Sequence, residues 1–343
     1  MASPHQAPSA RPGPSGPPPL VRRLAAVNRH LVVLVPAAMV LGLAAGAAAD
    51  LSALRSVVLP LTVLMVYPMM VGFRPRQALA RSDGRAIGLA MALNLLVLPA
   101  IAWMLARAFF GGDPGLFVGM VLAGLFPTSG MTISWTGFAG GNVRAAVKTT
   151  VIALVVASLL APVYLLALAG RVVEVDPWGV AGTVLAVVAV PMAAGSLTRA
   201  GVGARWGEDG LRRVMPVFPA LSTLGVLGIV FVAMALKASM IIERPGLLVR
   251  IAVPIVLFYA VNYLVAIVLG RRFLSRGDAI AVVYATVMRN LSIALGIAMT
   301  SFGAEAALVL AVAFVVQVQS AAGSVHLTDR FFGPAPVPVA VPA

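Results

Sequence analysis

Arg289 is the one ionised side chain that the hydrophobic pattern places deep inside an apolar segment. It lies in the run 282–294, eleven residues beyond Asp278, the nearest upstream charge. At a helical rise of about 1.5 Å per residue, this separation is about 16 Å, near the middle of a hydrocarbon layer about 30 Å thick. Because a charge at that depth costs several kcal/mol, Arg289 predicts a functional site that supplies it with a partner.

The chemistry of a guanidinium indicates what that partner is. Its planar fork of donors suits a carboxylate, a phosphate or another oxyanion in two-point contact. All eleven acidic side chains fall in loops or at the ends of expected spans. The compensating oxygens must therefore come from a loop acid that folds inward, from backbone carbonyls at a helix end, or from a bound solute. We favour the solute, so the sequence predicts a site for a small anion.

Catalytic and metal chemistry have little support in the sequence. The chain has no cysteine, and its three histidines, His5, His30 and His326, lie in the leader or at span ends. With no acid in a span either, neither a nucleophile with its base nor a set of metal ligands can be assembled within the membrane. We therefore expect no enzyme, no catalytic residue, no bound metal and no cofactor.

The composition is that of a polytopic helical membrane protein. Of the 343 residues, 61% are hydrophobic and only 10% are charged, which is too apolar for soluble domains. Ten apolar runs are each about long enough for a helix to cross a bilayer. They are 31–49, 52–73, 86–109, 115–139, 145–169, 178–199, 214–240, 247–270, 278–302 and 304–322.

The net charge of +14 follows the expected topology and does not indicate a nucleic-acid partner. With the N-terminus inside, most arginines fall in the leader and in loops on the cytoplasmic side. Outside that side and Arg289 there are only Arg55, Arg107, Arg171, Lys237, Arg244 and Arg250. The positive-inside rule therefore predicts a multi-pass protein of the plasma membrane, with a bacterial inner membrane expected and both termini cytoplasmic. Its expected partners are the lipid bilayer and the solute, and the oligomeric state is left open.

Ten spans divide into two halves of five, and an odd number per half inverts the second half in the membrane. We expect a disordered cytoplasmic leader at 1–26, a first five-helix repeat at 27–172, a second inverted repeat at 173–325, and a disordered cytoplasmic tail at 326–343. The Pro-rich composition of both ends supports the disorder.

The fourth span of each half carries a polar interruption at its centre. In the fourth span Pro127 removes a backbone donor and Gly130 follows closely, whereas the ninth span is interrupted at Arg289 and Asn290. Broken helices within a bilayer are tolerated where protein buries them or where they line a wet cavity. The alternative for the fourth span is a proline kink without function. Because both breaks occupy matching positions, we predict that helices 4 and 9 cross at one site near the midplane.

The chain resembles the bile acid/sodium symporter superfamily, and most closely its branch of ACR3-type arsenite permeases, from about residue 27 to 323. The most specific similarity is the segment 124–142, in which Met131, Trp135 and Asn142 are spaced as in the arsenite permeases. Val66-Tyr67-Pro68-Met69-Met70 resembles the second helix, and Asn94 with Pro99 resembles the third. The polar pair Arg289-Asn290 falls on the family's polar pair in the ninth helix.

The departures from the family pattern concern its ligands. Arsenite permeases carry a cysteine where Thr128 stands and a glutamate where Ser292 stands. The sodium-coupled branch carries a glutamate at Ala285 and a glutamine of its second sodium site at Arg289. Since sodium requires several hard oxygen ligands, usually with a carboxylate, the two-sodium mechanism is not expected here. We hypothesise that the Arg289 guanidinium occupies the space of a bound cation.

The sequence thus predicts a secondary transporter that moves a small anionic solute by alternating access. One alternative is an arsenite or metalloid efflux permease, since hydroxyls and amides can hold neutral arsenous acid without the cysteine. The alternative from another class is a passive channel or a non-transporting receptor. The expected substrate-binding residues are Arg289, Asn290, Ser292, Thr128, Ser129 and Thr132, supported by Asn94, Asn142, Thr150 and Pro127.

Overall fold

The computed structural model describes residues 30–71, 83–172, 176–215 and 217–334, and within these ranges the chain is helical without a strand. The predicted leader at 1–26 lies outside the described residues. Nine of the described helices are long and apolar enough to cross a membrane, and a bent pair provides a tenth span. This confirms the expected all-α polytopic membrane protein.

The helices follow the predicted apolar runs closely. In chain order they are α2 (Leu31–Ala48), η2 (Ser52–Val57), α3 (Val58–Val71), α4 (Gly84–Ala92), η4 (Leu93–Val97), α5 (Leu98–Phe110), α6 (Pro114–Leu125), α7 (Gly130–Phe138), α8 (Val143–Ala169), α9 (Pro177–Val184), η5 (Leu185–Ala189), α10 (Val190–Val214), α11 (Val217–Leu236), α12 (Ala238–Glu243), α13 (Gly246–Phe273), α14 (Arg276–Val287), α15 (Leu291–Ile297), η6 (Ala298–Phe302) and α16 (Ala304–Phe332).

Two helices differ from the predicted bounds. Helix α16 continues to Phe332, so residues 326–332, which we placed in a disordered tail, are helical. Helix α10 runs beyond the predicted end at 199 and turns at Gly207, whose φ of 64° is in the region that glycine tolerates without strain. Both extensions carry polar residues. A span predicted from an apolar run ends where that run ends, even if the helix continues.

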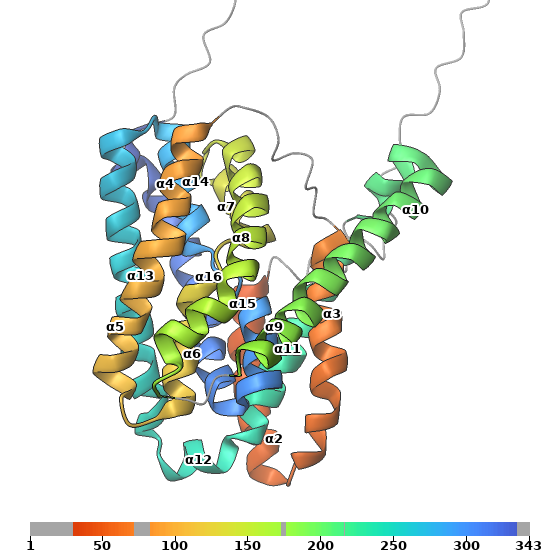
Figure 1. The fold of residues 1–343 in the computed structure, drawn as a ribbon, viewed down its shortest axis with the longest axis vertical. Helices are drawn as coiled ribbons and strands as arrows, with labels where there is room; N and C mark the ends of the chain where they lie inside the picture. Colours follow the sequence, from red (N-terminus) through yellow and green to blue (C-terminus); the bar gives the residue numbers. More distant parts are fainter. Residues whose placement is uncertain (1–29, 72–82, 173–175, 216, 335–343) are drawn as a thin grey trace, which may run out of the picture.

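The helices separate into two groups (Figure 1). Helix α11 packs along α2 and α3, and α10 packs on α3; we call these four helices the scaffold group. Small residues permit this close approach, because a Cβ at Gly225 would come within 2.6 Å of the backbone nitrogen of Met65. The other group, α4 to α8 and α13 to α16 with η4 and η6, contains both broken helices and is called the crossing group.

The broken helices form the most buried part of the molecule. The apolar window within the ninth span, 276–302, is 94% buried, whereas most other spans are less than half buried because they face lipid. In the crossing group, α6 packs directly on α16 at Gly119, where an added Cβ would lie 2.6 Å from the carbonyl oxygen of Ala306. The site is therefore enclosed by helices of its own group.

Candidate functional site at the crossing of the broken helices

The two breaks lie against each other at the centre of the crossing group. Helices α6 and α7 meet at an angle of 58°. Between them Phe126 is extended and Thr128 has a φ of 51°, an uncommon conformation for a β-branched residue. The backbone N–H of Asn290 donates to the carbonyl oxygen of Phe126 at 2.9 Å. The predicted crossing of helices 4 and 9 is thus present as a direct hydrogen bond between their interrupted backbones.

Polar side chains extend this contact. The hydroxyl of Thr132 donates to the carbonyl oxygen of Met288 at 3.5 Å and accepts from the backbone N–H of Ser129 at 3.2 Å. The side chain of Asn290 caps α15 by accepting from the backbone N–H of Ile293 at 3.3 Å. Together these bonds satisfy backbone groups that the interruptions of both helices leave without helical partners.

The guanidinium of Arg289 is fully buried among three oxygens. Its Nε donates to the carbonyl oxygen of Ala123 at 3.3 Å, and Nη2 donates to that of Gly124. Both carbonyls belong to the last turn of α6, where no helical N–H follows to donate to them. Its Nη1 donates to the amide oxygen of Asn94 at 2.5 Å. Of the three sources of oxygen considered from the sequence, the structure places the carbonyls of a helix end around the guanidinium.

The turn that contains Asn94 connects three spans at this point. Besides accepting from Arg289, Asn94 donates through Nδ2 to the carbonyl oxygen of Ala285 in α14 at 3.0 Å. Asn94 is fully buried in the π-helical turn η4, a local widening that is frequent at functional sites. The hydroxyl of Tyr164 from α8 donates to the carbonyl oxygen of Leu95 in the same turn. Asn94, which we predicted to support the site, therefore contacts Arg289 directly.

The backbone of Arg289 is held from α16 by Gln317. The Oε1 atom of Gln317 accepts from the backbone N–H of Arg289 at 2.8 Å, and Nε2 donates to the carbonyl oxygen of Arg289 at 3.2 Å. Tyr259 of α13 donates its hydroxyl to the same Oε1 at 2.8 Å. Side chain and backbone of Arg289 are thus fixed by different partners.

The positive charge of Arg289 has no carboxylate partner within the described part of the chain. The ion pairs of that part involve Arg144, Lys148, Lys237, Arg250 and Arg276. Likewise, no cluster of histidines and acids that could hold a metal ion occurs among the described residues. Arg289 is therefore solvated by neutral dipoles, and the crossing retains a net charge of one.

One side of the crossing is open at the start of α7. Gly130 is exposed, and a Cβ at this position would meet no atom within 4 Å. Beside it the hydroxyl of Ser129 is buried and has no hydrogen-bond partner among the described residues. The backbone N–H of Thr132 donates to the carbonyl oxygen of Ser129 at 3.0 Å, whereas the N–H groups before it in α7 have no helical acceptor. Donors are thus available at an accessible helix N-terminus.

Two predicted residues lie farther from this opening. Thr150 in α8 contributes its carbonyl oxygen, which accepts from the hydroxyl of Thr128 at 3.4 Å. Ser292, in the first turn of α15, is only 9% exposed. Apart from Asn142, the predicted residues are therefore brought together, but Thr128, Thr132 and Asn290 are occupied by protein partners.

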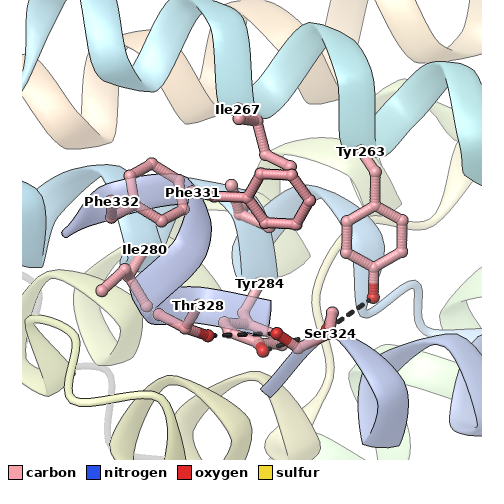
Figure 2. A pocket seen from close by; sticks show the side chains of 9 residues that line it. Tyr263, Ile267, Ile280, Tyr284, Ser324, Thr328, Phe331 and Phe332 are labelled. Carbon is pink, nitrogen blue, oxygen red and sulfur yellow. Dashed lines mark hydrogen bonds between the residues drawn. The ribbon is translucent and has the colours of Figure 1, made fainter. Parts of the chain in front are cut away.

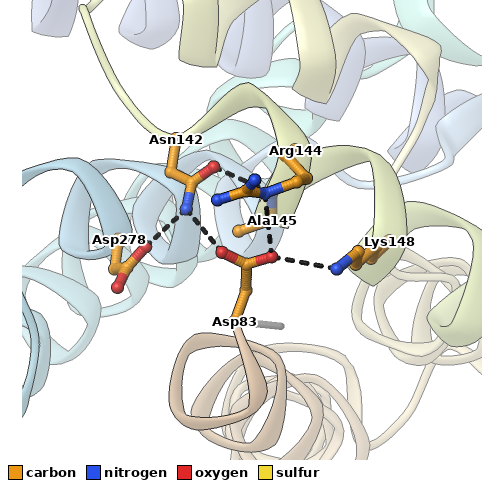
Figure 3. Close-up of polar contacts among 6 residues, drawn as sticks. All are labelled: Asp83, Asn142, Arg144, Ala145, Lys148 and Asp278. Carbon is orange, nitrogen blue, oxygen red and sulfur yellow. Dashed lines mark hydrogen bonds and ion pairs between the residues drawn. The ribbon is translucent and has the colours of Figure 1, made fainter. Parts of the chain in front are cut away.

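Asn142 is not at the crossing. Its Nδ2 donates to Asp83 at 2.9 Å and to Asp278 at 2.7 Å, at the opposite ends of α4 and α14 from the breaks (Figure 3). Lys148 pairs with the same Asp83 at 3.0 Å and is 2% exposed, whereas Arg144 pairs with it from the surface. From the sequence we counted Lys148 among the cations of the cytoplasmic side, whereas in the structure it is a second buried charge.

Gln317, Tyr259 and Asn262 were also missed. Asn262 in α13 donates to the carbonyl oxygen of Thr286 at 2.9 Å, one turn before Arg289. A polar residue near the middle of an apolar span, as Gln317 is, was the available signal. The position of each relative to the break depends on tertiary packing, which the sequence pattern does not contain.

A separate small cavity of about 20 Å³ lies between α13, α14 and α16 (Figure 2). The hydroxyls of Tyr263 and Tyr284 both lie 3.1 Å from the hydroxyl of Ser324 at its floor, and Phe331 and Phe332 cover it. Its size allows about one water molecule, so this cavity is not a candidate solute site.

Comparison with known proteins finds a matching family model and relatives that cover most of this chain. The model of the Sodium Bile acid symporter family matches residues 59–244. The chain is 22% identical to the Arsenical-resistance protein Acr3 of Corynebacterium glutamicum over 73% of this chain and 71% of that protein. It is 26% identical to the Uncharacterized protein YbaS of Bacillus subtilis over 71% of this chain and 80% of that protein.

Proposed function

Because this multi-pass chain belongs to the Sodium Bile acid symporter family and is thus a membrane transporter, we propose that it carries a small anionic solute without using sodium. The observation that carries the proposal is the Arg289 guanidinium, buried among three oxygens with no carboxylate partner among the described residues. The proposal places the protein in the plasma membrane with both termini in the cytoplasm.

The three oxygens around Arg289 support the view that its guanidinium takes the place of a bound cation. Two backbone carbonyls and one amide oxygen are the kind of ligands that hard cations take in proteins. Here their lone pairs already accept from Arg289, and the guanidinium fills the space between them. Because a covalently attached cation cannot leave with the solute, a sodium gradient has no ion to drive through this site.

The charge of the crossing supports an anionic solute. A single positive charge surrounded by neutral dipoles attracts an anion strongly where water is excluded. At the open side, Ser129 and the free N–H groups at the start of α7 supply donors, and the helix dipole there favours negative charge. The solute would thus feel Arg289 through its field, while neutral donors make the direct contacts.

Alternating access follows from the division into two groups. The crossing group touches the scaffold group at α15, where a Cβ on Gly296 would lie 2.8 Å from Thr62 in α3. It also touches it at one end of the bundle, where Lys237 pairs with Glu305 at 2.8 Å. Rocking of one group on the other about these contacts would expose the crossing to each side in turn.

The test compares uptake by proteoliposomes in sodium and in potassium buffers, using a panel of small carboxylates and inorganic phosphate. We expect saturable uptake that shows counterflow and differs less than two-fold between the buffers. Clear stimulation by sodium in the native chain would contradict the proposal. Conductance that does not saturate would instead support the passive channel, and binding without flux would support a receptor.

Arsenite or metalloid efflux is the second candidate, favoured by the similarity to a protein named for arsenical resistance. Neutral arsenous acid could be held by the hydroxyls at the crossing, although Thr128 stands where arsenite permeases have a cysteine. An arsenite-sensitive bacterial strain that expresses this chain separates the candidates. Restored resistance that Arg289→Ala abolishes would favour efflux over the transport of an organic anion.

A further inference from the structure

The amide side chain of Gln317 replaces the helical hydrogen bonds that the break in the ninth span removes. In a continuous helix the N–H and C=O of residue 289 would pair along the helix axis. Here both pair with Gln317 of α16, at 2.8 Å and 3.2 Å. The N–H also donates to the carbonyl oxygen of Val287 at 2.8 Å, whereas the C=O takes its donor from Gln317. Within a bilayer an unpaired backbone group costs several kcal/mol, so a partner at this point is required.

The two breaks meet this requirement differently. The break after α6 contains Pro127, which has no N–H to satisfy. The break after α14 contains no proline, so every peptide N–H there needs an acceptor. For the N–H of Arg289, Gln317 supplies an acceptor from α16 in addition to the carbonyl oxygen of Val287, and Gln317 is itself fully buried.

Tyr259 fixes the orientation of the Gln317 amide. Because the backbone N–H of Arg289 can only donate, the amide atom that faces it must be Oε1. The Tyr259 hydroxyl donates to the same oxygen at 2.8 Å, and Nε2 faces the carbonyl of Arg289. Tyr259 is also fully enclosed, being 2% exposed on α13. Through Gln317, helices α13 and α16 thus hold the two peptide units on either side of the Arg289 Cα, and the second of these units carries the N–H of Asn290.

We propose that Gln317 is a positioning residue, which acts through the Arg289 peptide to aim the start of α15 at the crossing. The adjacent N–H of Asn290 donates to Phe126 at 2.9 Å, and this bond depends on the direction of the preceding peptide. Ser292 lies in the first turn of α15, two residues farther on. This deepens the proposed function, on which it rests, by naming the residue that holds the site's second helix in register.

The test uses the absence of cysteine from the chain and needs no substrate. A single reporter, Ser292→Cys, is treated with a neutral maleimide, and the rate of modification is measured in purified protein. Ser292 is 9% exposed, so the native background should react slowly. We expect Gln317→Leu to raise the rate at least ten-fold, because the first turn of α15 loses its direction.

Gln319→Leu is the matched control. It lies on the same helix and also removes one side-chain bond to a backbone carbonyl, that of Val32 at 2.8 Å. The rate at the Ser292→Cys reporter should stay within two-fold in this variant. A second reporter, Ala161→Cys in α8, is fully buried and detects general loosening of the fold.

Tyr259→Phe distinguishes positioning from independent destabilisation. If Tyr259 acts through Gln317, then Tyr259→Phe raises the rate by a smaller factor, and Tyr259→Phe combined with Gln317→Leu reacts no faster than Gln317→Leu alone. The proposal is overturned if the two substitutions multiply each other's effect on the modification rate. It is also overturned if Gln317→Leu raises the rate equally at Ala161→Cys, or leaves the rate at Ser292→Cys unchanged. None of these results depends on whether the protein transports an anion.

Discussion

Arg289 Nη1 donates to the amide oxygen of Asn94 at 2.5 Å, and this contact joins the break of the ninth span to the third span. Asn94 at the same time donates to Ala285, so one neutral side chain links the charged residue to the helix that leads to it. The contact is central because it holds the guanidinium in place without cancelling its charge.

Two substitutions at Asn94 separate geometry from charge. Asn94→Leu leaves a charged donor buried and unpaired, and should destabilise the protein by about 3 kcal/mol, measured by chemical unfolding in detergent. Asn94→Asp keeps an acceptor for Arg289 but neutralises the crossing. We expect it to retain most of the stability and to lose anion uptake; full uptake with Asn94→Asp would contradict the role of the charge.

Asp83 has one buried and one exposed cationic partner, which gives a matched pair of variants. Lys148→Met removes the buried partner, 3.0 Å away, and should cost about 2 kcal/mol or more because the Asp83 carboxylate, only 6% exposed, loses its buried cation. Arg144→Gln removes a partner that is 69% exposed and should cost less than about 1 kcal/mol. The unfolding midpoints of the two variants show which one loses more stability. Equal losses would show that the burial of the cation does not determine how much it stabilises the fold.

The contact of Gly296 with Thr62 predicts a variant that folds but does not transport. A Cβ at Gly296 would lie 2.8 Å from the Thr62 side chain, at the surface on which the two groups must move. Gly296→Val should reduce turnover at least ten-fold. Gly182→Val, at a helical glycine whose Cβ would meet nothing within 4 Å, is the control and should stay near the native rate. Equal turnover in both variants would argue against rocking at this surface.

Hydropathy alone predicted the spans well because a bilayer requires every crossing segment to be helical and about 20 residues long. The breaks were also predictable, since Pro127 and the pair Arg289-Asn290 are polar or donor-free interruptions within apolar runs. The extension of α16 to Phe332 was not, because a helix that leaves the membrane no longer needs an apolar sequence.

The hydrogen-bond partners on other helices were harder to predict than the positions of the two breaks. The sequence left three sources open for the oxygens around Arg289, and the choice of the α6 carbonyls depends on where that helix ends relative to α14. Asn142 was assigned to the crossing because its spacing resembles a family motif. Its side chain instead caps α8 and bridges Asp83 and Asp278.

The most direct test of the account is the electrostatic potential at the open side of the crossing. Gly130→Cys places the chain's only thiol at an exposed position with free space around it. The rates of modification by an anionic and a cationic methanethiosulfonate reagent are measured with Arg289 present, with Arg289→Gln, and with Arg55→Gln as a control arginine in η2. A fixed positive charge at the crossing predicts that the anionic reagent is favoured, and that Arg289→Gln lowers this preference about ten-fold while Arg55→Gln does not. The same preference with and without Arg289 would contradict the claim that its buried charge selects anions.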